Sequence, residues 1–75
     1  MRWHDYISID PQVCHGKACI RGTRVPVYVV LDNLAAGLSA VDIQESYPSV
    51  SAEAIHAALA YAADLASERI VAMPS

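Results

Sequence analysis

The chain has 75 residues, of which 55% are hydrophobic and 17% are charged, and its formal net charge is −3 at pH 7. A chain this short forms one domain (residues 1–75), and it carries so much apolar surface that we expect a homodimer or a complex with another protein. The acidic balance counts against tight DNA binding by the isolated domain, because contacts from Lys and Arg to phosphates supply most of the affinity of such proteins.

Residues 1–25 are predicted to form an irregular or β-rich arm. Alternation predicts a short strand over Tyr6–Ile9, with Ile7 and Ile9 on one face because alternate residues of a strand point to the same side. Ala18–Ile20 is predicted to be a second extended segment that pairs with the first as a small hairpin. A lone hairpin is only marginally stable, so this one needs a partner chain or the helices beneath it.

Residues 26–70 are predicted to form a three-helix bundle. The first helix starts near Pro26, because proline suits the first helical position, and it ends at Gly37, because glycine tolerates the left-handed conformation there. Between these two residues, apolar side chains recur at helical spacing. They form one stripe of five residues: Val27, Val30, Leu31, Leu34 and Ala35.

Two serines predict the starts of the other two helices. Ser39 caps a short helix over Ala40–Tyr47, and Asp42 stands in the acidic position of a capping box. Ser51 caps the third helix, which runs from about Ala52 to Glu68. The chain is therefore predicted to be mainly helical after its N-terminal arm.

The third helix carries two adjoining apolar lines, which together are wider than the core of a three-helix domain needs. The first line is expected to face the core and contains Ile55, Leu59, Ala62, Ala66 and Ile70. The second line is expected to form a subunit or partner interface and contains Ala54, Ala58, Tyr61 and Leu65. Trp3 and Tyr6 either anchor an interface or cover the small core.

Cys14 and Cys19, with His15 between them and His4 upstream, raise the question of a zinc site. The spacing is weak evidence, because structural zinc sites bring a second closely spaced pair of ligands from elsewhere in the chain. A disulfide across the turn is sterically conceivable, but it is expected to be reduced in a cytosolic protein. Two thiols and no metal are therefore expected, with Cys19 acting as a small core residue.

Catalysis and membrane attachment are not expected either. A nucleophile needs a base within reach, and the side chains of Cys14 and His15 point apart in an extended segment. The polar N-terminus is not followed by an apolar run long enough for a signal peptide or a membrane span. We therefore expect a cytoplasmic, non-enzymatic protein without a cofactor.

The most distinctive polar feature is the segment Arg21–Arg24, with the sequence Arg-Gly-Thr-Arg. Together with Lys17, it places three of the five basic residues within eight positions. One interpretation is a solvated turn whose arginines pair locally with Asp10 or Asp32. The other is that Arg21 and Arg24 dock onto carboxylates or phosphates, which the planar guanidinium group suits.

These motifs resemble the domain of unknown function 433 family of bacteria and archaea. The resemblance rests on Ile9-Asp10-Pro11, on the run from Gly16 to Val27 around Cys-Ile-Arg-Gly-Thr-Arg-Val-Pro-Val, and on shorter matches as far as Tyr61-Ala62. It covers roughly residues 7 to 65. His15 stands where the family commonly has glycine and Ala18 where it commonly has proline, so the shape of this turn is where the chain departs from its relatives.

The resemblance implies a homeodomain-like helix-turn-helix fold with a winged-helix character, in which the N-terminal hairpin is an added element. The helix-turn-helix then comprises the second helix, the turn at residues 47–50 and the third helix. The first residues of a recognition helix reach base edges, and those able to contact DNA here are Ser49, Ser51 and His56. Glu53 would repel phosphates.

The resemblance also implies a VapB-type antitoxin, because members of the family are often encoded beside a PIN-like toxin ribonuclease. Arg21 and Arg24 are then expected to enter the carboxylate cluster of the nuclease, with support from Lys17, Tyr61 and Leu65. Replacing both arginines by alanine is expected to abolish neutralisation without unfolding the chain. The alternatives are a small dimeric helix-turn-helix regulator that binds operator DNA and a purely structural dimerisation module; an antitoxin can also repress its own operon.

Overall fold

The computed structural model describes residues 2–12 and 16–70. Its elements are η1 (Trp3–Asp5), β1 (Ile7–Ser8), β2 (Cys19–Ile20), α1 (Val27–Ala35), α2 (Ala40–Ser46) and α3 (Ala52–Ile70). The prediction of a mainly helical fold, with three helices and a short N-terminal pair of strands, is confirmed. Within the described residues, no helix combines the length and the hydropathy that a membrane span requires.

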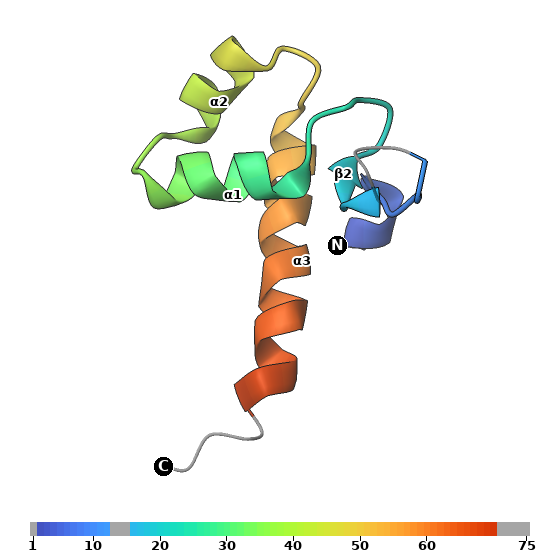
Figure 1. The fold of residues 1–75 in the computed structure, drawn as a ribbon. Helices are drawn as coiled ribbons and strands as arrows, with labels where there is room; N and C mark the ends of the chain where they lie inside the picture. Colours follow the sequence, from blue (N-terminus) through green and yellow to red (C-terminus); the bar gives the residue numbers. More distant parts are fainter. Residues whose placement is uncertain (1, 13–15, 71–75) are drawn as a thin grey trace.

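Helix α3 is the axis of the molecule. Figure 1 shows α1 and α2 on one side of the first half of α3 and the N-terminal segment with its strands on the other side. The second half of α3 extends beyond both groups. The hydrophobic core therefore lies at the first half of this helix, and the second half has few neighbours to cover it.

The two strands are shorter than the sequence predicts. They pair antiparallel, with Ile7 opposite Ile20 and Ser8 opposite Cys19. Ile7 is buried, whereas Ile9 is 60% exposed and lies outside β1, so the predicted strand face with both Ile7 and Ile9 is not formed. The reason is that strand pairing ends at Ser8. Ile9 is therefore not held in the extended strand geometry that would place its side chain on the same side as Ile7.

Helix α1 begins one residue later than predicted, because Pro26 belongs partly to the sheet. Pro26 is the N-cap of α1, with an extended ψ of 147°, and it forms an isolated antiparallel bridge with Cys19. The amide of Val27 donates to the carbonyl of Ala18 at 2.9 Å. Backbone pairing with the second strand therefore continues up to the first helical residue and keeps Pro26 out of the helix.

The predicted helix caps are present. Gly37 follows α1 with a φ of +94°, the left-handed conformation that ends many helices. Ser39 and Asp42 form a reciprocal capping box at the start of α2, with bonds of 3.0 and 3.2 Å. The hydroxyl of Ser51 accepts a hydrogen bond from the amide of Ala54 at 3.0 Å in the first turn of α3.

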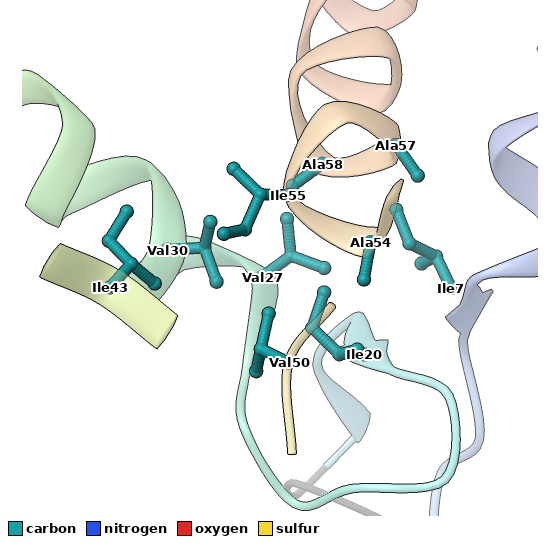
Figure 2. Packing of buried hydrophobic residues seen from close by; sticks show 10 residues of the cluster. All are labelled: Ile7, Ile20, Val27, Val30, Ile43, Val50, Ala54, Ile55, Ala57 and Ala58. Atoms are coloured by element: carbon teal, nitrogen blue, oxygen red, sulfur yellow. The ribbon is translucent and has the colours of Figure 1, made fainter. Parts of the chain in front are cut away.

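The core is a single cluster to which the strands, the three helices and the turn between α2 and α3 contribute (Figure 2). Each of its members is at most 3% exposed, so the apolar area of these side chains is almost completely removed from water. The cluster consists of Ile7, Ile20, Val27, Val30, Ile43, Val50, Ala54, Ile55, Ala57 and Ala58.

The burial of the two apolar lines of α3 differs from the prediction. Ala54 and Ala58, which were expected at an interface, are buried, and Tyr61 is half-buried against the core. Leu59, which was expected in the core, is 48% exposed. Small alanines let α3 lie close to its neighbours, and the core therefore gathers on that side of the helix. Leu65 of the second line is 45% exposed, because it lies on the projecting half.

The aromatic residues of the N-terminal segment cover the core. Trp3 and Tyr6 are half-buried and pack against the core cluster. The ring of Trp3 meets the ring of Tyr61 edge-on at a centroid distance of 4.8 Å. Of the two predicted roles for Trp3 and Tyr6, the structure therefore supports the one in which they cover the core.

Candidate functional site

The Arg-Gly-Thr-Arg segment forms a closed turn between β2 and α1. The amide of Thr23 donates to the carbonyl of Ile20 at 3.0 Å, and the amide of Ile20 donates to the carbonyl of Val25 at 2.9 Å. The Thr23 hydroxyl donates to the Ile20 carbonyl at 2.8 Å and accepts from the Val25 amide at 3.0 Å. Gly22 has a φ of +81°, which favours glycine at this position of the turn. These hydrogen bonds therefore fix the backbone of the turn from which its two arginines extend.

Arg21 is bound to the N-terminal segment. Its Nη2 donates to the carbonyl oxygens of His4 at 3.0 Å and Ile7 at 3.1 Å. The interpretation that this arginine pairs locally is thus supported, but within residues 2–12 and 16–70 its acceptors are carbonyl oxygens rather than Asp10 or Asp32. Arg21 therefore braces β1 and η1 against the turn.

Arg24 is exposed and borders an open depression of about 500 Å³. The depression is lined by Ser8, Cys19, Ile20, Arg21, Gly22, Thr23 and Arg24. Its floor includes the buried Cys19, whose Sγ donates to the Thr23 carbonyl at 3.2 Å. Guanidinium groups, a serine hydroxyl and turn backbone around one depression suit an anionic group of a partner.

Lys17 lies beside a residue that the sequence analysis did not single out. Its Nζ is 5.1 Å from the centroid of the Tyr28 ring, which is 50% exposed at the start of α1. The Val27 amide, bonded to Ala18, places these two chain segments side by side. Tyrosine is enriched among the residues that dominate binding interfaces, so the exposed Tyr28 is a candidate contact residue. Its position outside the apolar stripe of the first helix is the sequence signal that could have identified it as solvent-facing.

The predicted partner-binding residues of α3 lie in another part of the molecule. Tyr61 is half-buried and its ring contacts Trp3, whereas Leu65 is exposed on the second half of α3. Leu59 is exposed in the first half of α3, although the sequence placed it in the core. The two arginines therefore lie in the turn between β2 and α1, whereas the exposed leucines lie on α3.

The predicted DNA-contacting residues are exposed, but their surroundings are acidic. Ser49, Ser51 and His56 all face solvent, and the Ser51 hydroxyl already accepts the bond that caps α3. The exposed residues of α3 also include Glu53 and Asp64, and no Lys or Arg occurs between residues 52 and 67. Such a helix face repels phosphates rather than attracting them.

The zinc and disulfide hypotheses involve Cys14 and His15, which lie outside the described residues. Cys19, expected as a small core residue, is 1% exposed, as predicted. Within the described ranges, no three His, Cys, Asp or Glu side chains come together in a group that can hold a metal ion.

Comparison with known proteins gives three findings. Residues 7–62 match the model of DUF433, which is described as a protein of unknown function. "Uncharacterized protein y4eO" of Sinorhizobium fredii (strain NBRC 101917 / NGR234) is 41% identical over 58 residues, which are 77% of this chain and 26% of that protein. The chain thus spans about a quarter of the length of this relative. The crystal structure of a DUF433 member from Anabaena variabilis superposes with a TM-score of 0.75 at 33% identity, covering 91% of this chain and 69% of that chain.

Proposed function

The chain belongs to the DUF433 family, and we propose that it is a non-catalytic, antitoxin-like binding protein that neutralises a PIN-like toxin ribonuclease. The observation that carries the proposal is the braced arginine turn. A chain with only five basic residues places two of them in one four-residue turn beside an open depression. Hydrogen bonds within the turn fix its backbone, so little ordering entropy is lost when a partner binds.

The chemistry of the partner follows from the arginines. PIN-like nucleases gather carboxylates around a divalent metal, and a guanidinium group that enters this cluster blocks the substrate while it forms paired hydrogen bonds with carboxylate oxygens. Arg24 is our candidate for this contact. Arg21 already donates to two carbonyl oxygens, and its role is to hold the turn in place.

Apolar contacts add the remaining binding surface. Leu59 and Leu65 are about half exposed, Leu59 in the first half of α3 and Leu65 in the second half, and Ala63 and Ala66 are exposed as well. Leu59, Ala63 and Ala66 recur at helical spacing on one face of α3, and exposed apolar residues grouped on one face mark contact surfaces. We propose that this face packs on the nuclease or on a second copy of the chain in a homodimer.

A titration of nuclease activity tests the proposal. The purified chain is added to a PIN-like nuclease from the same organism, and cleavage of a labelled RNA is followed. Wild-type chain is expected to inhibit at an equimolar ratio, and Arg24→Gln is expected to inhibit at least about tenfold less well because a charged hydrogen bond is lost. Arg2→Gln is the matched control, because Arg2 is exposed and remote in sequence from the turn. Equal inhibition by all three proteins would rule out Arg24 as the contact.

Operator binding by the α2–α3 pair is the second proposal. It is favoured by one observation: the segment between these helices is anchored by Val50, which is completely buried, so α2 and α3 are held in a fixed relation. The acidic exposed face of α3 speaks against tight binding by a single chain. Operator affinity that falls steeply with salt concentration would support this role.

A further inference from the structure

We propose that the depression at the Ile20–Val25 turn is a carboxylate-binding subsite. The Gly22 amide, the Arg24 guanidinium group and the Ser8 hydroxyl together hold one carboxylate of an acidic protein partner. The identity of that partner rests on the proposed function, whereas the subsite itself rests on the geometry of the turn.

The donors of this subsite share one depression, because Ser8, Gly22 and Arg24 all line it. The amides on either side of Gly22 are used inside the fold: Arg21 donates to the Tyr6 carbonyl and Thr23 to the Ile20 carbonyl. Neither the Gly22 amide nor the Ser8 hydroxyl donates to another residue within the described part of the chain. A carboxylate accepts from backbone amides, hydroxyls and guanidinium groups, so this donor set fits it.

Arg21 is a positioning residue for the subsite. Its guanidinium group binds the carbonyl of Ile7, the residue before Ser8, and its amide binds the Tyr6 carbonyl at 2.8 Å. These bonds hold the strand that carries Ser8 against the turn that carries Gly22. The two arginines therefore have different roles: Arg21 fixes the two walls of the depression, and Arg24 is part of its lining.

The surrounding charge favours a carboxylate on a protein over a nucleic-acid phosphate. A nucleic acid presents a row of phosphates and binds a row of cations. This chain carries a net charge of −3, and its cations near the turn form a short group of Lys17, Arg21 and Arg24. A single compact group of donors suits one acidic side chain.

The test uses the full chain labelled with ¹⁵N and a small probe, N-acetyl-L-aspartate N′-methylamide, whose only charge is the side-chain carboxylate. At constant ionic strength, the Gly22 amide resonance is expected to shift saturably with this probe. The matching asparagine compound, which lacks the charge, is expected to leave it unmoved. Arg24→Gln is expected to weaken the apparent affinity about tenfold, and Arg24→Lys, which keeps the charge, to weaken it less. Arg2→Gln is the control variant and is expected to bind as the wild type does.

Three results would overturn the proposal. They are a Gly22 resonance that does not saturate, equal shifts with the aspartate and asparagine compounds, and wild-type affinity in Arg24→Gln with all core resonances unchanged. Inorganic phosphate that binds more tightly than the aspartate probe, together with duplex DNA that moves the same resonance, would assign the subsite to nucleic acid instead. Normal aspartate binding by a chain that fails to inhibit the nuclease would count against the proposed function alone.

Discussion

The indole N–H of Trp3 donates a hydrogen bond to the Asp64 carboxylate at 2.5 Å, across 61 positions of the chain. The Trp3 ring also meets Tyr61 edge-on and stacks on His4 at a centroid distance of 3.7 Å. These contacts fasten η1 to α3 at the point where the helix leaves the core. The same N-terminal segment is held at its other side by Arg21, so the Arg-Gly-Thr-Arg turn and α3 are connected through it.

Removal of the Asp64 carboxylate should loosen this N-terminal contact. Asp64→Ala is expected to lower the free energy of unfolding by about 1 kcal/mol, at the low end for a charged acceptor because the pair is exposed. Trp3 is the only tryptophan, so its emission maximum reports on this contact and should move to longer wavelength. Asp32→Ala, which removes an exposed acid from α1, is the control. An unchanged emission maximum in Asp64→Ala would contradict the contact.

The brace formed by Arg21 should contribute to stability. Arg21→Gln is expected to lower the free energy of unfolding by about 1–2 kcal/mol, because two carbonyl oxygens lose a charged donor. Arg2→Gln, which removes only an exposed 4.0 Å contact with Asp5, is expected to change it by less than about 0.5 kcal/mol. Urea denaturation measures both. Equal stabilities of the two variants would show that Arg21 does not brace the fold.

The turn conformation requires glycine for its backbone and not for space. A Cβ at Gly22 would meet no atom within 4 Å, so Gly22→Ala is expected to cost about 1 kcal/mol through the φ of +81° alone. Asparagine tolerates this region better, so Gly22→Asn should cost clearly less. Thermal unfolding of the two variants checks the order. A greater loss in Gly22→Asn than in Gly22→Ala would point to a steric cause instead.

The capping box of α2 predicts a pH dependence. Hydrogen bonds from the Ser39 backbone amide, and then its side chain, lower the pKa of Asp42 below its usual 3.8. Because the folded-state pKa is the lower one, the stabilisation is complete above the unfolded-state value and is lost as the pH falls through the folded-state value. The difference in unfolding free energy between wild type and Asp42→Asn should therefore shrink below about pH 4. Glu45→Gln, in the same helix but outside the capping box, is the control. A difference that stays constant down to pH 2 would contradict this account.

The elements that depend on neighbouring residues could be predicted from the sequence. The helix caps depend on residues that are close together in the sequence, and they start or end the helices as expected. They are Ser39 with Asp42, Gly37 and Ser51. Pro26 was misplaced by one residue because a distant strand residue, Cys19, pairs with it. The residues next to Pro26 in the sequence do not indicate that it pairs with Cys19.

The use of the faces of α3 could not be predicted, because it depends on which side of the helix the neighbouring elements pack against. Leu59 has the spacing of a core residue and directly follows the buried Ala58, yet it is 48% exposed, because the core gathers on the side of α3 that carries Ala54 and Ala58. Likewise, the arginine turn was identified from its composition, but the different roles of Arg21 and Arg24 depend on the carbonyl positions of His4 and Ile7.

The most direct test of the central claim is affinity purification of the tagged chain from its native lysate, with wild type, Arg24→Gln and Arg2→Gln in parallel. The eluates are analysed by mass spectrometry and by their absorbance ratio at 260 and 280 nm. Wild type and Arg2→Gln are predicted to retain a ribonuclease with an acidic active site in equimolar amount, and Arg24→Gln is predicted to lose it. Recovery of the same nuclease by Arg24→Gln, or of DNA without a protein partner by the wild type, would contradict the account.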